Sequence, residues 1–191
     1  MFSGFIFDLD GTLVNSTLNF QEIKRAVGCP SNQDLLSYAE QLEPVNKRKV
    51  IQTIEHYELE DAKNSQILPG AKEFLAWLRQ LSIPSALVTR NSPKATELKL
   101  TQNKLSFDIV LTREDSLPKP APDALLRILN EWQFTGEQTV YIGDYLYDIQ
   151  AARNAKMNSY LYAPEIIPQY ATMADLTFNC WHDLLERISA N

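Results

Sequence analysis

Near its start the chain carries Phe5-Ile6-Phe7-Asp8-Leu9-Asp10-Gly11-Thr12, an apolar run that ends in two carboxylates and a glycine. Such a run, stopped by acidic residues and Gly, is typical of a buried strand whose carboxyl end opens into a loop. We therefore expect a strand over residues 2–9, leading directly into a polar loop. The pattern of the residues after this strand then decides the architecture.

The chain changes character after Asn15. Its residues there are rich in Glu, Gln, Lys and Leu, with apolar positions three and four apart, which predicts helices over residues 18–27, 33–42 and 45–61. From Pro69 onward short apolar runs alternate with helical patterns. The predicted strands are 85–89, 107–112, 139–142, 159–162 and 175–178, and the predicted helices are 69–80, one from Ser92-Pro93, one with Pro122 and Asp123 in its first turn, 147–155 and one from Trp181.

Alternating strands and helices predict an α/β fold with a Rossmann-like, doubly wound parallel sheet that helices cover on both faces. The all-helical stretch is then an insertion after the first strand. We expect a core domain made of residues 1–14 and 67–191, and a small all-helical domain of residues 15–66.

The composition is that of a globular protein and excludes several classes. Of the 191 residues 45% are hydrophobic, which excludes a disordered chain, and the net charge of -6 argues against a nucleic-acid binder. The N-terminus lacks the basic region of a signal peptide, and no apolar run approaches the ~20 residues that span a bilayer. Cys29 and Cys180 have neither disulfide-framework nor zinc-site spacing, so we expect a cytoplasmic protein without a membrane partner.

Polar side chains follow four of the predicted strands at or shortly after their carboxyl ends, where ligands bind in doubly wound sheets. They are Asp8 and Asp10, Thr89, Lys119, and Asp144 with Asp148. Several carboxylates together need a compensating cation, and a set of oxygen ligands without His or Cys favours Mg²⁺. A Lys beside such an ion is suited to a phosphate, so the pattern indicates phosphoryl transfer.

At this point the sequence resembles the haloacid dehalogenase superfamily of aspartate-nucleophile hydrolases. Four stretches, spread over nearly the whole chain, are similar to the motifs of that superfamily in the same order. They are Phe7-Asp8-Leu9-Asp10-Gly11-Thr12-Leu13, Leu87-Val88-Thr89-Arg90-Asn91, Lys119-Pro120-Ala121-Pro122-Asp123, and Gly143-Asp144 with Asp148-Ile149-Gln150-Ala151-Ala152. The helical insertion resembles the C1-type cap of phosphoglycolate phosphatases and β-phosphoglucomutases.

The resemblance implies a role for each motif residue. Asp8 is the nucleophile that forms an aspartyl-phosphate, and Asp10 is the general acid and base. Thr89 and Lys119 bind the phosphoryl group, with the backbone amides of Arg90 and Asn91 nearby. Mg²⁺ is then held by Asp8, the main-chain carbonyl of Asp10, and Asp144, with Asp148 positioning the ion or its waters.

Asp10 separates the possible activities. Haloalkanoate dehalogenases expel halide and lack an Asp at this position, whereas phosphatases and phosphomutases have one. We expect a phosphatase of small phosphorylated metabolites, similar to phosphoglycolate phosphatases. Two alternatives stay open, namely a phosphomutase of the β-phosphoglucomutase type and a catalytically silent binding protein on the same fold.

Several residues have a plainer interpretation beside the functional one. Asp148, in the first turn of a predicted helix, equally suits the helix dipole. Tyr145 stands where the superfamily usually has Ser or Thr and is positioned to narrow the mouth of the site. The basic residues of the insertion, Lys24, Arg25, Lys47, Arg48 and Lys49, suit an anionic substrate but are more typical of a solvated helix face. The oligomeric state is open, with a monomer compatible with the sequence.

Overall fold

The computed structural model describes residues 2–190; the end positions 1 and 191 of the predicted core lie outside them. Within these residues a six-stranded sheet has the order β3-β2-β1-β4-β5-β6, and every neighbouring pair is parallel. The strands are β1 (Gly4–Phe7), β2 (Ser85–Val88), β3 (Ile109–Leu111), β4 (Thr139–Gly143), β5 (Asn158–Tyr162) and β6 (Leu176–Phe178). This order, with β1 inside the sheet, confirms the predicted doubly wound α/β fold.

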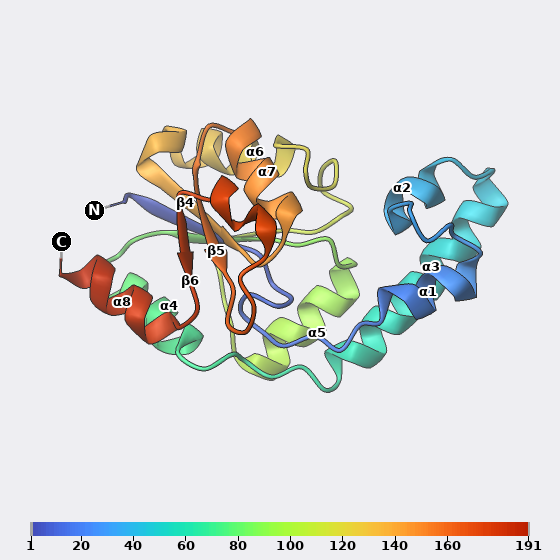
Figure 1. Cartoon of the computed structure of the whole chain (residues 1–191), viewed down its shortest axis with the longest axis horizontal. Helices are drawn as coiled ribbons and strands as arrows, with labels where there is room; N and C mark the ends of the chain where they lie inside the picture. The colour runs from blue at the N-terminus through green and yellow to red at the C-terminus, as the bar shows by residue number, and fades with distance from the viewer. Residues whose placement is uncertain (1, 191) are drawn as a thin grey trace.

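Helices cover both faces of the sheet (Figure 1). On one face α4 (Ala71–Gln80) and α8 (Trp181–Ser189) pack on Phe5 and Phe7, and on the other α6 (Asp123–Trp132) and α7 (Leu146–Asn154) pack around Ile6. Successive strand residues point to opposite faces, so β1 is buried on both sides. Burying each of these side chains stabilises the fold by about 1.5–3 kcal/mol.

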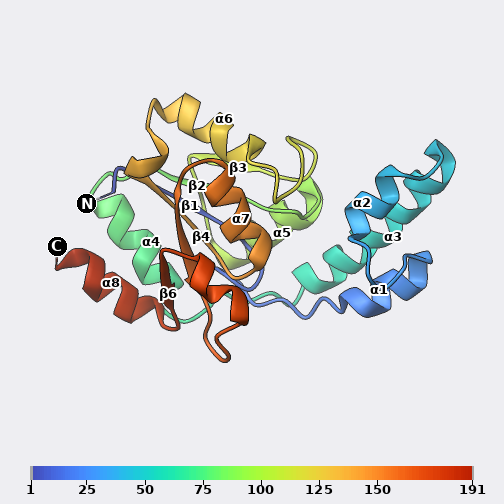
Figure 2. The same ribbon diagram turned by 45° about the horizontal axis from the view of Figure 1, so that its top comes forward.

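Three helices between β1 and α4 lie together away from the sheet (Figure 2). They are α1 (Phe20–Val27), α2 (Leu35–Glu40) and α3 (Pro44–Ala62), and they share a hydrophobic cluster that includes Ile23, Leu35 and Ile54. Of the core, α5 (Pro93–Asn103) packs against α3. We call α1 to α3 the cap helices; that they form a domain bounded at residues 15 and 66 stays a prediction.

The two connections between the cap helices and the core run side by side (Figures 1 and 2). The backbone N–H of Asn15 donates to the carbonyl of Gln66 at 2.9 Å, and the backbone N–H of Gln66 donates to the Asn15 side chain at 2.7 Å. The cap helices are therefore joined to the core through one paired hinge.

The predicted elements agree with the structure to within two residues at each end. Strand β3, predicted over 107–112, is shorter in the structure, and side chains hydrogen-bond to the backbone near both of its ends. The Asp108 carboxylate accepts from the backbone N–H of Ser85 at 2.8 Å, and the Asp115 carboxylate accepts from that of Thr112 at 2.8 Å. Two short 3-10 helices, Gly136–Gln138 and Gln169–Met173, were not predicted.

Among residues 2–190, none of the helices combines the length and the apolar character that crossing a membrane requires.

Candidate active site

The sheet order brings the motif residues to one edge. Asp8 directly follows β1, Thr89 follows β2 and Asp144 follows β4, and these three strands are neighbours in the sheet. Parallel strands end on the same edge, so loops that are distant in sequence meet there. Lys119, in the loop between β3 and α6, reaches this edge from a neighbouring position.

Lys119 is the centre of the site. Its side chain is 6% exposed, and its Nζ donates to Asp8 Oδ1 at 2.5 Å, to Asp148 Oδ1 at 2.6 Å and to the Tyr141 hydroxyl at 2.9 Å. Burial alone would lower the pKa of this ammonium, but the carboxylates of Asp148 and Asp8 outweigh it and raise that pKa above its ordinary value. Lys119 therefore stays a cation, and its three N–H donors have acceptors.

Three carboxylates crowd together at this edge. Oxygens of Asp8, Asp144 and Asp148 all lie within 4.8 Å of one another. Burial, together with the neighbouring carboxylates and against the effect of Lys119, raises the pKa of Asp8 to about 7 and that of Asp144 to about 8. The single positive charge of Lys119 therefore does not balance the negative charge of three ionised carboxylates. An all-oxygen donor set with this unmet charge fits a hard divalent cation such as Mg²⁺.

Gly11 and Gly143 allow these carboxylates to approach the backbone. Gly11 has φ +75°, and a Cβ there would lie 2.2 Å from Asp144 Oδ2. At Gly143 a Cβ would lie 2.3 Å from the Cβ of Asp148. Both glycines are required because a side chain would occupy the space of an acidic group of the site.

Asp148 contacts both the start of α7 and the buried Lys119. Its Oδ1 accepts from Lys119 and from the Tyr141 hydroxyl, and its Oδ2 accepts from the backbone N–H of Tyr145 at 3.0 Å, at the start of α7. One carboxylate thus caps a helix and faces the charged cluster. Its predicted part in metal binding stays a prediction.

In the loop after β2, the Thr89 hydroxyl accepts hydrogen bonds from both the backbone N–H and the side-chain amide of Asn91, at 3.2 and 3.0 Å. The Arg90 guanidinium pairs with Asp34 of the cap region at 2.6 Å and lies over the Tyr147 ring. Any contact of Arg90 with a phosphate would therefore come from its backbone, as the motif resemblance implies.

Asp10 has partners that the sequence did not predict. Its Oδ1 accepts from the ammonium of Lys99, and its Oδ2 accepts from the side-chain amide of Asn91 at 2.5 Å. Lys99 is fully buried on α5 and also contacts Asp61 of α3. The sequence held one signal for this residue, since Lys99 lies three and four positions after the buried Thr96 and Ala95, on the inward face of the helix.

Ion pairs join the cap helices to the core. The Arg113 guanidinium pairs with Glu58, both side chains being buried, and the Lys94 ammonium lies 3.1 Å from Glu55. With the Arg90 to Asp34 pair they link cap residues to loops and helices beside the site. Salt bridges therefore contribute to the contact between the cap helices and the core.

Three basic residues of the insertion contact groups that lie within seven positions of them in the sequence. Lys47 pairs with Glu40 at 2.6 Å, the Lys24 ammonium donates to the carbonyl of Ser31 at 2.8 Å, and the Arg25 Nε donates to the carbonyl of Gln21 at 3.3 Å. Arg48 and Lys49 are exposed. These contacts support the solvated-face interpretation.

Tyr145 is 52% exposed at the start of α7, and its ring contacts those of Tyr147 and Tyr170. The Tyr170 hydroxyl donates to the carbonyl of Asp144 at 3.4 Å. An aromatic group therefore lies next to the acidic cluster.

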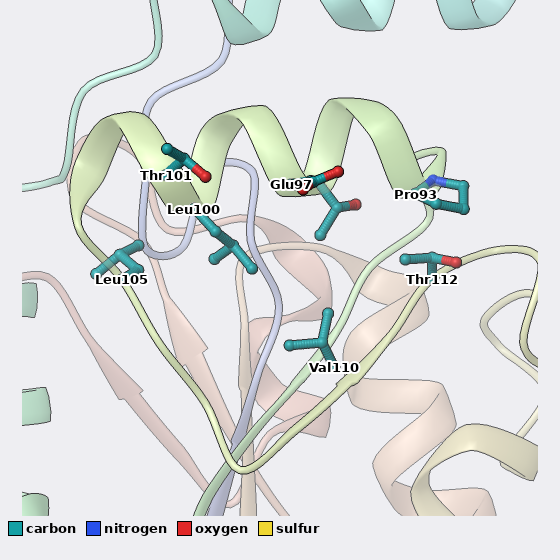
Figure 3. Close-up of a pocket in the computed structure, with 8 residues that line it drawn as sticks. Pro93, Glu97, Leu100, Thr101, Leu105, Val110 and Thr112 are labelled. Carbon is teal, nitrogen blue, oxygen red and sulfur yellow. The ribbon is translucent and has the colours of Figure 1, made fainter.

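A cavity of about 420 Å³ lies elsewhere, between α5 and β3 (Figure 3). Its lining includes Leu100, Leu105 and Val110 and contains none of the motif residues. This apolar hollow is separate from the charged site.

Several known proteins are similar to this chain in sequence or in fold. Residues 16–162 match the profile of the haloacid dehalogenase-like hydrolase family. A haloacid dehalogenase-like hydrolase domain-containing protein of Arabidopsis thaliana is 32% identical over 76% of this chain and 64% of its own length. A phosphoglycolate phosphatase of Pseudomonas putida is 28% identical over 78% of this chain and 65% of its own length. The chain thus spans slightly less than two thirds of either relative.

Among solved structures, that of a hydrolase from Pseudomonas syringae has a TM-score of 0.83 and 22% identity, covering 100% of this chain and 99% of the other. At this identity the likeness shows the shared fold. The family match covers most of the chain and includes three of the four motif loops in full. The chain belongs to the haloacid dehalogenase-like hydrolases.

Proposed function

We propose that this protein is a Mg²⁺-dependent phosphatase that hydrolyses a small phosphorylated metabolite through an aspartyl-phosphate. One of its relatives is a phosphoglycolate phosphatase. The observation that supports this most is the contact of buried Lys119 with Asp8, beside the carboxylates of Asp144 and Asp148. A nucleophile and a cation side by side in a site of raised pKa values suit attack on an anionic phosphate.

In the proposed first step, a carboxylate oxygen of Asp8 attacks phosphorus, and the bond from phosphorus to the leaving oxygen breaks. Asp10 gives its proton to that oxygen, so the product leaves as an alcohol. In the second step water attacks phosphorus, Asp10 takes a proton from it, and inorganic phosphate and the Asp8 carboxylate are released. Both residues return to their starting states.

The remaining residues bind and orient. Lys119 offsets charge on Asp8 and the phosphoryl oxygens, while the Thr89 hydroxyl and the backbone amides of Arg90 and Asn91 hydrogen-bond those oxygens. Asp8, the Asp10 carbonyl and Asp144 would hold Mg²⁺, with Asp148 orienting them. When bound, that ion neutralises negative charge on the transferring group.

The cap helices, proposed as a domain of residues 15–66, would cover the site and exclude water during the reaction. The three-helix insertion leaves room for a small leaving group, and the ring of Tyr145 would narrow the entrance. The proposed substrate is therefore a phosphorylated small molecule rather than a polymer.

A panel of phosphorylated metabolites tests the proposal. Purified protein is incubated with each ester in Mg²⁺ or in chelator, and phosphate release is measured. We expect release from small phosphate esters in Mg²⁺ and a loss of release in chelator. A phosphomutase would instead interconvert hexose phosphates rapidly while releasing phosphate slowly, and absence of metal-dependent turnover across the panel would favour a binding protein.

The pKa values predict how metal stabilises the fold. The folded-state pKa values of Asp8 and Asp144, about 7 and about 8, exceed the ordinary value of 3.8, so folded protein keeps protons that the unfolded chain releases. Without metal the free energy of unfolding therefore falls as pH rises from about 4 to about 8. Mg²⁺ binds the deprotonated carboxylates and offsets this loss.

We thus expect the rise in Tm between chelator and Mg²⁺ to be larger at about pH 8 than at about pH 6, across the window set by these pKa values. Thermal unfolding followed by circular dichroism measures it. A rise that is equal at both pH values, or larger at the lower one, contradicts the placement of Mg²⁺ among these carboxylates.

A further inference from the structure

Lys99 is a buried lysine that none of the four motifs contains. Its side chain is 0% exposed, and its ammonium donates to Asp10 and, at 2.8 Å, to Asp61 Oδ2. A buried ammonium is costly unless carboxylates compensate it, and these two outweigh its burial and raise its pKa. Lys99 is therefore a cation that joins two acidic groups from different parts of the chain.

Asp61, the second partner of Lys99, lies beside the hinge formed by the two connections between the cap helices and the core. It lies at the end of α3, and its Oδ1 accepts from the backbone N–H and the hydroxyl of Thr17 at 2.6 and 2.9 Å. Its Oδ2 accepts from the Ser16 hydroxyl at 3.0 Å. Asp61 thus ties the segment that enters the cap helices to the helix that leaves them.

Asp10 is held at both carboxylate oxygens. Lys99, from α5, contacts Oδ1, and Asn91, from the loop after β2, contacts Oδ2 at 2.5 Å. Two donors from different elements fix both the position and the plane of this carboxylate. The Asp10 side chain is nevertheless 23% exposed, so the carboxylate is partly accessible while Lys99 and Asn91 hold it in place.

We propose that Lys99 is a positioning residue for Asp10, which it holds in place for proton transfer and connects through Asp61 to the hinge of the cap. This rests on the proposed function, in which Asp10 protonates the leaving oxygen. Lys99 would act on the reaction through Asp10, because its ammonium contacts Asp10 and Asp61. Its position couples the proton donor to the segment on which the cap would move.

The leaving group of the substrate separates positioning from a merely structural role. Phenolate leaves phosphorus slowly without a proton, whereas 2,4-dinitrophenolate leaves readily without one. General acid catalysis contributes about 10²–10⁴-fold, and only where the proton is needed. The kcat/KM value covers the steps through departure of the leaving group, so later hydrolysis of the aspartyl-phosphate does not enter it.

The experiment compares kcat/KM in Mg²⁺ for phenyl phosphate and 2,4-dinitrophenyl phosphate. The variants are Lys99→Met, which keeps the length of the side chain, and Asp61→Asn, which keeps Lys99 and every motif residue. Arg113→Met is the matched control, because it removes another buried pair between cap and core, with Glu58, that does not touch Asp10. Circular dichroism and Tm establish that each variant is folded.

We expect Lys99→Met to lose about 100-fold in kcat/KM on phenyl phosphate and less than about 3-fold on the dinitrophenyl ester. Asp61→Asn should change the ratio in the same sense by about 10-fold, and Arg113→Met should leave the ratio unchanged. If Lys99→Met does not fold, the ratio in Asp61→Asn decides.

Equal losses on both esters, or a change of ratio in Arg113→Met as large as in Lys99→Met, would overturn the positioning role while the phosphatase proposal stands. A wild-type protein that hydrolyses neither of these esters nor any ester of the metabolite panel would overturn the proposed function and the inference with it.

Discussion

Asp8→Asn is expected to reduce phosphate release from every phosphomonoester by on the order of 10⁴-fold or more, the usual cost of removing a nucleophile. The carboxamide has the size of the carboxylate, and its oxygen can still accept from Lys119, which contacts Asp8 Oδ1 at 2.5 Å. Its oxygen is, however, too weak a nucleophile to attack phosphorus. The covalent intermediate cannot form, so turnover is lost even where substrate still binds.

The same change should leave the fold as stable as before or more so. Burial raises the pKa of Asp8 to about 7, which means that the folded protein holds this carboxylate at a cost at neutral pH. A neutral amide avoids that cost, and Asp148 still compensates Lys119. We therefore expect an unchanged or higher Tm in chelator together with the loss of turnover.

Phosphate release and thermal unfolding of the Asp8→Asn protein measure both effects. Asp183→Asn is the control, since Asp183 is an exposed carboxylate in the first turn of α8. Turnover by Asp8→Asn within tenfold of wild type would refute the aspartyl-phosphate mechanism.

The position of the site could be predicted from sequence because it depends on strand ends. Asp8, Thr89 and Asp144 each follow a short apolar run, and parallel strands bring such ends to one edge whatever their order in the sheet. The alternation of short apolar runs with helical patterns also predicted the number of strands and their approximate boundaries. The predicted ends differ by up to two residues, as at the start of β3, where the Asp108 carboxylate accepts from the backbone N–H of Ser85.

The sequence did not predict the ion pairs between side chains that lie far apart in the chain. Lys99 lies 89 positions from Asp10 and 38 from Asp61, so no spacing rule joins them. Glu58 and Arg113 are likewise 55 positions apart. A charged residue on the inward face of a helix indicates a buried partner, but only the packing of α3 on α5 identifies which one.

The cap helices carry the part of the function that is least determined by the motifs. Charged contacts such as Arg90 with Asp34 pair cap and core side chains, while Arg48 and Lys49 of the cap helices are exposed. The residues of the described chain nearest the acidic cluster and still exposed include Tyr145. Under the proposed function, side-chain shape near Tyr145 would contribute to selecting the leaving group.

Lys119→Met is the second change with a large expected effect. The ammonium of Lys119 contacts both Asp8 and Asp148, and it is the group that lowers the pKa of Asp8 against the effects of burial. Its loss should reduce turnover by about 10³-fold, because the nucleophile and the phosphoryl oxygens lose the cation that offsets their repulsion. Phosphate release from the esters that wild type hydrolyses measures this loss.

The stability of Lys119→Met should depend on pH in a direction that the site determines. Leaving a buried charge without its partner costs about 3–5 kcal/mol. The pKa of Asp8, already raised to about 7, should rise further without Lys119, so folded protein keeps this proton to higher pH. The free energy of unfolding of Lys119→Met in chelator should therefore fall further below that of wild type as pH rises.

Urea unfolding of the wild type, both single variants and the double variant Asp8→Asn with Lys119→Met tests this argument as a cycle. If charge on Asp8 causes the loss, the double variant should recover part of the stability that Lys119→Met loses at about pH 8. Additive losses would instead assign the cost to Asp148, whose Oδ1 lies 2.6 Å from the same ammonium. The cycle thus separates the two carboxylates that share one lysine.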